Sequence, residues 1–297
     1  RARAADLFCG DAKFHLNTDS SFVRFPETQY ICTMTDFEYN LGTKILSMEH
    51  KGKTAAGLIP PDRLLRLDFN NLAKPTFFAT NSLRDTIVFN SLNAKYNVKE
   101  EIIEADNISY IHIADALIQP ENGKITISRR AKIEKLKNAF IAVNKLHLLH
   151  TASIDIESAK RYSGSAIYDY VEDNNDIRQI NFPEITVDTM ATSARGFISA
   201  DQKFMLSSAF TFTGDVNLYS RSKNLLFTGS AGILHDCHTF ESYPVKFKSF
   251  IDPKNVMITL SEKPRDVNDN VVYSGSFMNL DSIHIYPAFL SQQKSWT

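Results

Sequence analysis

The densest group of metal-binding side chains in the sequence is His235-Asp236-Cys237-His238. Imidazole and thiolate groups are ligands that zinc prefers, and a structural zinc site holds four ligands. Alternate residues of an extended strand point to opposite faces, so one ion would meet at most two of these side chains. Two more would have to come from elsewhere, and the candidates are His147 and His150. We therefore interpret the group as a polar turn and predict no metal site.

Hard oxygen ligands gather at Asp266, Asn268, Asp269 and Asn270, as they would around calcium. The glycine and the closing glutamate of an EF-hand loop are missing, so we expect a solvated turn. Ser163-Gly164-Ser165 lacks the flanks of a nucleophile elbow, and no phosphate-binding or dinucleotide-binding loop occurs. We therefore expect no enzyme, and we name no catalytic, cofactor-binding or metal-binding residue and no cofactor.

Composition excludes several other classes of protein. The 297 residues carry a net charge of −1, which provides no basic field for a nucleic acid, and their 43% hydrophobic content argues against disorder. No stretch of 18 apolar residues predicts a transmembrane span, and the first residues lack the apolar core of a signal peptide. The abrupt start predicts a mature protein or an excised fragment. Three widely spaced cysteines allow one disulfide at most, with Cys9–Cys32 the closer pair and Cys237 far away.

The pattern of the chain predicts mostly β structure. Phe, Tyr, Ile, Val and Thr are frequent, and they fit half-buried pleated surfaces. Apolar and polar residues alternate in short runs that follow one another closely, which is typical of strands joined by hairpins. The runs cover residues 125–128, 133–136, 140–143, 154–157, 165–171, 185–188 and 210–219, of which 140–143 is apolar throughout. A helix over 125–143 is the alternative there, but its apolar residues form no continuous stripe. Asn/Asp clusters at 172–176 and 266–270 predict turns.

Two-strand units recur along the chain. Residues 37–46 resemble 94–103 and 216–226, and a second echo relates 110–117 to 282–289. Units that cannot bury a face alone are what stacked architectures use. We therefore predict an all-β fold of stacked β-hairpin repeats, a folded-over β-solenoid, with a β-sandwich or jelly roll as the alternative. The expected division is an N-terminal β segment at 1–50, a linker or long loop at 51–68 and the repetitive domain at 69–297.

The units at 93–106 and 212–218 resemble the repeats of the lipopolysaccharide-transport family, also known as organic solvent tolerance proteins. The periplasmic domains of that family carry A-x-Y-d and f-x-G-n-V strand pairs. The resemblance implies a folded-over β-solenoid in a Gram-negative envelope, with an apolar interior that holds acyl chains. Between residues 125 and 205 the chain departs from the family's regular spacing. The composition is also similar to that of large envelope proteins of Bacteroidetes-type bacteria.

We therefore expect a non-enzymatic protein of the cell envelope, in the periplasm or at the outer membrane. It would act as a scaffold or contact lipid or lipopolysaccharide. The strand-like ends at 12–16 and 282–286 would pair through their sheet edges with flanking domains of a longer chain or with another envelope protein.

The main alternative is a surface module that binds glycans or protein through exposed aromatic rings. The candidate rings are Tyr162, Tyr168, Tyr170 and Tyr219. Alternating tyrosines more often pack in the core or across strands. A β-helix polysaccharide-degrading enzyme is the least favoured reading, because 11 Gly are few for its tight corners.

Overall fold

The structure, a computed structural model, describes residues 7–8, 11–16, 22–49, 58–69, 72, 74–81, 86–234, 243–278 and 285–291. The chain forms two compact units. The first comprises residues 1–167 and 183–193, and the second comprises residues 168–182 and 194–297. Each unit is described by itself.

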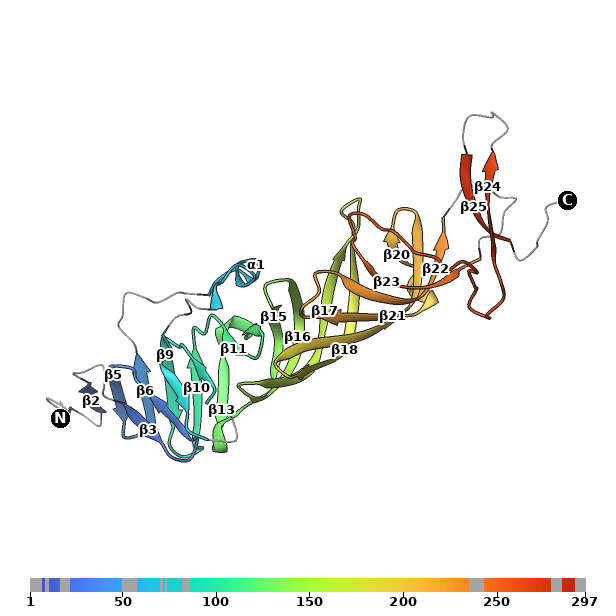
Figure 1. Ribbon diagram of the computed structural model, residues 1–297. Helices are drawn as coiled ribbons and strands as arrows, with labels where there is room; N and C mark the ends of the chain where they lie inside the picture. The colour runs from blue at the N-terminus through green and yellow to red at the C-terminus, as the bar shows by residue number, and fades with distance from the viewer. Residues whose placement is uncertain are drawn as a thin grey trace. The chain divides into compact units, whose positions relative to one another are not determined.

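Antiparallel strands build the first unit and form two sheets (Figure 1). Sheet A has the strand order β1 (Leu7–Phe8), β2 (Asp11–His15), β5 (Asp36–Asn40), β6 (Ile45–Glu49), β9 (Asn93–Asn97), β10 (Ile102–Asp106), β13 (Ile125–Ser128) and β14 (Lys132–Ile133). Sheet B has in this unit the order β3 (Val23–Phe25), β4 (Tyr30–Cys32), β7 (Phe77–Ala79), β8 (Val88–Phe89), β11 (Ile111–Ile113), β12 (Ala116–Gln119), β15 (Leu136–Val143), β16 (His147–Ser158) and the first part of β17 (Arg161–Val171). The 3₁₀ helices η3 (Glu121–Gly123) and η4 (Arg129–Ala131) lie in connections.

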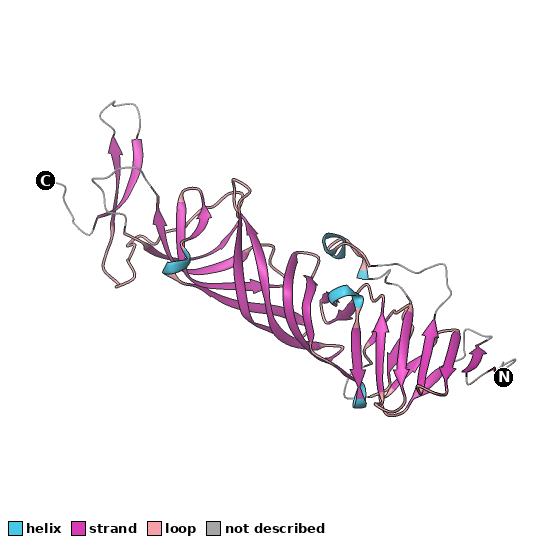
Figure 2. Ribbon diagram, turned by 180° about the vertical axis from the view of Figure 1, so that it is seen from behind, coloured by secondary structure: helices cyan, strands magenta, loops and turns pink. Residues whose placement is uncertain are grey.

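Consecutive hairpins of this unit alternate between the two sheets. Hairpin β1–β2 belongs to sheet A, β3–β4 to sheet B and β5–β6 to sheet A, and the alternation continues to β15–β16 in sheet B. Figure 2 shows how strands dominate the structure, with only short helical segments. The predicted all-β class is therefore confirmed.

The apolar faces of the two sheets pack against each other. In sheet A, the cross-strand register aligns Tyr39 with Leu46, Leu46 with Tyr96, and Tyr96 with Ile103. The ring of Phe25 in sheet B lies 4.8 Å from the ring of Tyr96, centroid to centroid. Sheet B also buries Tyr30, Cys32, Phe77, Phe89, Ile111 and Ile113. Alternation of residue type thus gives each sheet one face that is removed from water, which stabilises the unit.

The connection between β6 and β7 packs on the outer face of sheet B. It contains α1 (Pro61–Leu64), and Leu64 is buried against Leu117 and Ala142. Strand β6 before this connection pairs with β9 after it, so both sides belong to sheet A. The described part of the connection, from residue 58 onward, therefore passes over the outer face of sheet B. Residues 51–57 lie outside the described residues.

The second unit has the strand order β18 (Ile177–Asp188), β19 (Ala191–Ile198), β21 (Phe210–Tyr219), β22 (Leu225–Ile233) and β23 (Val245–Ile251). Strands β17, β18 and β19 each have one part in either unit. Strand β20 (Phe204–Ser207) follows η5 (Ala200–Gln202) and pairs with β21, and β24 (Tyr273–Met278) pairs with β25 (Ile285–Ser291). The core is aromatic, with ring contacts among Tyr170, Phe204, Phe212, Phe227 and Phe247.

Two glycines permit a close approach of backbones in this unit. Gly214 of β21 lies opposite Gly229 of β22, and the φ angle of Gly214 is 144°. A Cβ atom on Gly229 would lie 2.1 Å from the carbonyl oxygen of Thr213. Glycine is therefore required here, as is typical of tight bends in sheets.

Most predicted strands are present. Residues 125–128 form β13, 154–157 lie within β16 and 210–219 form β21, and no α-helix occurs within 125–143. The single strand predicted over 133–136 is wrong. Strand β14 ends at Ile133 in sheet A, and β15 begins at Leu136 in sheet B, because the chain crosses between the sheets at this point.

Candidate functional site

The interior of the first unit is exposed along part of one side. In the aligned row of sheet A, Tyr39, Leu46 and Tyr96 are only half-buried, whereas Ile103 and Ile127 farther along the row are fully buried. The partly exposed side chains have the same inward orientation as the buried ones, because residues directly opposite one another in neighbouring strands point to the same face of the sheet. The apolar interior thus reaches water at β5, β6 and β9.

Two matching turns extend this exposed apolar surface. Hairpins β5–β6 and β9–β10 have turns of equal length, in which Lys44 and Glu101 occupy equivalent positions with φ angles of 62° and 58°. The N–H of Val98 donates to the carbonyl oxygen of Lys44 at 3.1 Å, so the turns are neighbours. Leu41 and Val98 are each 42% exposed. We call Tyr39, Leu41, Leu46, Tyr96 and Val98 the apolar edge.

Asparagines fix both turns in the same way. The side-chain oxygen of Asn40 accepts the N–H of Thr43 at 2.7 Å, and that of Asn97 accepts the N–H of Lys99 at 3.0 Å. Short polar side chains commonly hold such turns through their own backbone. The apolar edge is therefore presented by two rigid hairpins.

One ion pair lies beside the apolar edge. Glu101 forms an ion pair with Arg129. Burial raises the pKa of the Tyr96 hydroxyl, Glu101 and Glu27 raise it further, and Arg129 opposes them. The phenol is accordingly neutral near neutral pH and presents an apolar ring with one hydroxyl.

The opposite face of sheet A is polar. A groove of about 470 Å³ crosses it, with charged or polar side chains from β2, β5, β6, β9 and β10. The pairs Lys13–Glu38 and His15–Asp36 each lie 3.1 Å apart. Most of these charges pair with one another across exposed strands. We therefore interpret the groove as a solvated face of the sheet.

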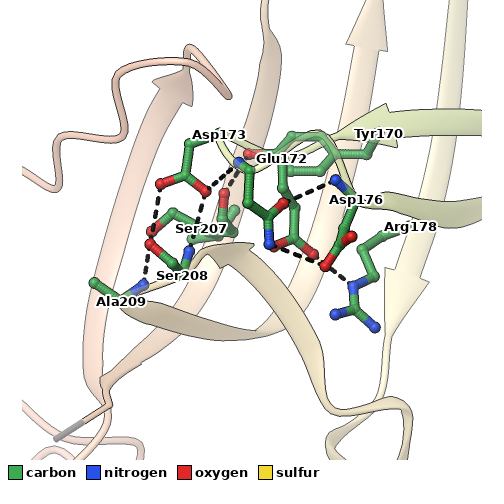
Figure 3. Close-up of polar contacts among 10 residues, drawn as sticks. Tyr170, Glu172, Asp173, Asp176, Arg178, Ser207, Ser208 and Ala209 are labelled. Atoms are coloured by element: carbon green, nitrogen blue, oxygen red, sulfur yellow. Dashed lines mark hydrogen bonds and ion pairs between the residues drawn. The ribbon is translucent and has the colours of Figure 1, made fainter.

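The predicted turn at 172–176 is present in the second unit, where hydrogen bonds and an ion pair hold it in place (Figure 3). The buried carboxylate of Glu172 accepts a hydrogen bond from Nε of Arg178 at 2.5 Å. Asp173 accepts the N–H of Ser208 at 3.2 Å and its hydroxyl at 3.1 Å. Desolvation acts to raise the pKa of Asp173, but the hydrogen bonds from Ser208 together with backbone N–H groups, including that of Asn174, outweigh it and lower the pKa. Carboxylate oxygens of Glu172 and Asp173 are thus engaged by protein donors, so we interpret the cluster as structural.

The predicted calcium-like group is also a turn. Asp266 accepts backbone N–H groups from Asn268 and Asn270, both at 2.9 Å, and Nζ of Lys246 donates to Asp269 at 2.8 Å. Both carboxylate oxygens of Asp266 and one of Asp269 are thus engaged by internal donors.

The His235-Asp236-Cys237-His238 group lies outside the described residues. Of its two candidate helpers, His147 is buried and His150 contacts the hydroxyl of Thr151. Within the described ranges, no three His, Cys, Asp or Glu side chains are arranged to hold a metal ion.

The tyrosines considered for sugar stacking divide between core and surface. Tyr162 and Tyr170 are buried, Tyr168 contacts Phe182, and Tyr219 is exposed.

The hydroxyl of Ser163 donates to the carboxylate of Glu157 at 3.0 Å. Cys32 is a free, buried thiol, and Cys9, its suggested disulfide partner, lies outside the described residues.

Comparisons of the chain with protein-family models, with curated proteins and with solved structures found no match. In the part of the chain that the structure describes, no helix has the length and hydropathy needed to cross a bilayer.

Sequence reasoning did not single out the apolar edge as a site. Its residues nevertheless lie in the two segments, 37–46 and 94–103, that the sequence marks as similar units. The signal was their shared Tyr-Asn pair followed by an exposed apolar turn residue, Leu41 or Val98.

Proposed function

We propose that the chain is a non-enzymatic β-solenoid protein of the Gram-negative cell envelope that contacts lipid through the apolar edge. The solenoid reading is supported by hairpins that alternate between two sheets and by the matching turns of β5–β6 and β9–β10. Each hairpin has one apolar face, which only a neighbouring hairpin and the facing sheet can cover.

The partial exposure of the apolar edge is the observation that carries the lipid proposal. An acyl chain has no hydrogen-bonding groups, and it gains about 0.8 kcal/mol for each methylene removed from water. The edge offers a strip of aliphatic and aromatic side chains next to a packed interior. A tail lying along Tyr39, Leu46 and Tyr96 would extend that interior without burying a charge.

The ends of the sheets provide the proposed contacts with partners. Strand β3 is the last strand of sheet B in the first unit, and β14 is the last of sheet A. Terminal strands leave backbone donors and acceptors that pair with another strand. We propose that flanking parts of a longer chain, or another envelope protein, add strands at these edges.

A fluorescent fatty acid, 11-(dansylamino)undecanoic acid, tests the lipid proposal. Leu46→Asp should weaken its binding by about tenfold or more, because the new carboxylate disfavours an apolar neighbour. Ser47→Asp is the matched control, since Ser47 is the adjacent residue on the polar face, and its effect should stay below about twofold.

Leu41→Asp serves as a second variant, because Leu41 is in an exposed turn and its replacement leaves the packed interior intact. It should weaken the probe in the same direction. Equal affinities of the wild type, Leu41→Asp and Leu46→Asp proteins, or absence of probe binding to the wild type, would contradict the proposal.

A protein- or glycan-binding surface is the second candidate, and one observation favours it. Phe197 and Phe250 of the second unit are 62% and 50% exposed. Phe250 lies across from Leu226 on the outer face of its sheet. If this surface is functional, Phe250→Ser should abolish retention on a glycan array or on an immobilised envelope fraction, while Leu41→Asp leaves retention unchanged.

A further inference from the structure

Three strands of the second unit, β21, β22 and β23, carry exposed apolar side chains on the outer face of their sheet. Phe250 of β23 lies directly opposite Leu226 of β22, and Leu226 lies directly opposite Asn217 of β21. Residues that are directly opposite one another point to the same face, and Tyr219 shares the facing of Asn217 because the side chains of a strand alternate. Tyr219, Leu226 and Phe250 therefore lie on one face of three neighbouring strands.

This face is open to water, whereas the other face of the same strands is the core of the unit. Tyr219 is 43% exposed, Phe250 is 50% exposed, and Leu226 between them is half-buried. The alternate residues Phe227 and Phe247 point to the other side of the sheet and are buried there. Exposed apolar patches with a polar rim mark interaction sites on protein surfaces.

Cations surround the exposed rings. Arg221 and Lys223 are exposed in the turn between β21 and β22. Lys248 of β23 is also exposed, two residues before Phe250 and on the same face. Within the part of the chain that the structure describes, none of these three cations forms an ion pair. We call Tyr219, Arg221, Lys223, Leu226, Lys248 and Phe250 the basic aromatic surface.

Two carboxylates next to this surface are paired with other cations. Asp215 lies on the same face of β21, and its carboxylate is 3.6 Å from the guanidinium of Arg195. Asp269 accepts from Nζ of Lys246 at 2.8 Å. The uncompensated charge of the basic aromatic surface is therefore positive, and it attracts an anionic partner.

We propose that the basic aromatic surface docks on the headgroups of a bilayer that contains anionic phospholipids. Aromatic and aliphatic side chains enter the boundary between headgroups and acyl chains, and lysine and arginine are attracted to the anionic lipids beside them. The long stems of Arg221, Lys223 and Lys248 let their charges reach the phosphates while the rings lie deeper.

The charges favour a membrane surface over the glycan considered above for Phe250. A neutral glycan would stack on the rings but would leave the three cations without a partner. The basic aromatic surface belongs to the second unit and the apolar edge to the first. The proposal therefore does not depend on binding of an acyl chain at the apolar edge.

Co-sedimentation of the full chain with lipid vesicles tests the proposal. Vesicles of phosphatidylcholine and phosphatidylglycerol in equal amounts are anionic, and vesicles of phosphatidylcholine alone are the matched neutral surface. The chain should bind the anionic vesicles about tenfold more tightly, and about 0.5 M NaCl should remove most of this preference by screening. Equal binding to both kinds of vesicle, binding to neither, or a preference that salt leaves intact would overturn the proposal.

Single variants locate the contact. Lys223→Glu and Lys248→Glu should each weaken binding to the anionic vesicles about fivefold or more, because each replaces an attraction by a repulsion. Phe250→Ser should weaken it about threefold, because less apolar area leaves water. Lys203→Glu is the matched control, since this exposed lysine precedes β20, which pairs with the end of β21 far from Tyr219. Its effect should stay below about twofold.

The outcomes separate the basic aromatic surface from the apolar edge. Lys248→Glu should leave the affinity for 11-(dansylamino)undecanoic acid unchanged, and Leu41→Asp should leave vesicle binding unchanged. If Lys223→Glu and Lys248→Glu are folded by circular dichroism and bind anionic vesicles as tightly as the wild type, the proposal is wrong, whatever the fatty acid shows. An equal loss in Lys203→Glu would also contradict it, because the attraction would then depend only on the net charge of the chain.

Discussion

The hydroxyl of Tyr162 lies 2.8 Å from Oγ1 of Thr192, and Oγ1 of Thr192 lies 2.5 Å from a carboxylate oxygen of Asp115. Because the threonine hydroxyl donates to the carboxylate, the tyrosine hydroxyl must donate to the threonine. The backbone N–H of Thr192 also donates to Asp115, at 3.1 Å. This chain of hydrogen bonds joins β17, the β11–β12 turn and β19 within the first unit.

Tyr162→Phe should lower the free energy of unfolding by about 1 kcal/mol, since it removes one buried hydrogen bond and leaves the ring in place. Urea denaturation followed by circular dichroism measures this loss. Tyr219→Phe, which removes an exposed hydroxyl, should change the stability by less than about 0.5 kcal/mol. Equal stabilities of the two variants would show that the buried hydrogen bond contributes nothing.

Cys32 should resist alkylation in the folded protein. Burial raises the pKa of its thiol from 9.0 to about 12, although a hydrogen bond from the backbone of Met34 acts in the opposite direction. The reactive thiolate is therefore scarce even at pH 9. In a Cys9→Ser, Cys237→Ser background, iodoacetamide at pH 8 should label Cys32 only after unfolding, as read by mass spectrometry.

The same shift has a definite sign for stability. The folded state favours the neutral thiol, so the contribution is complete below the unfolded pKa of 9.0 and is lost as pH rises from there toward 12. Cys32→Ala in the same background should reduce the fall in stability between pH 8 and pH 11. Rapid labelling of the folded protein would contradict the burial argument.

Arg178→Leu should destabilise the second unit by about 1–3 kcal/mol, because it leaves the buried carboxylate of Glu172 without its main partner. Arg161→Leu removes an exposed ion pair with Glu157, whose closest atoms are 4.0 Å apart, and should cost less than about 0.5 kcal/mol. Thermal unfolding compares the two. Glu172→Leu combined with Arg178→Leu should recover part of the loss, and no recovery would place the cost elsewhere.

Gly229→Ala should destabilise the second unit by about 1–3 kcal/mol, since its Cβ would overlap the carbonyl oxygen of Thr213. Gly42→Ala is the matched control, because a Cβ there meets only the side-chain oxygen of Asn40, at 3.4 Å. Chemical denaturation should show a clear loss for the first variant and little change for the second.

The all-β class, most strands and the turns at 172–176 and 266–270 could be predicted from the residues alone. Those features depend on local chemistry: alternation of apolar and polar residues buries one face of a strand, and Asn or Asp side chains bond to their own backbone. The likeness of 37–46 and 94–103 also lay in the sequence, and both segments form hairpins with the same turn.

Which faces of the sheets meet, and where they remain open to water, depends on contacts between distant parts of the chain. The residues 133–136 look like one strand, but β14 and β15 lie in different sheets because pairing with distant strands outweighs local pattern. Tyr39, Leu46 and Tyr96 resemble any core residues in the sequence, and only the packing around them shows that they are partly exposed. The basic aromatic surface likewise needs three strands in register, which alternation along a single strand cannot reveal.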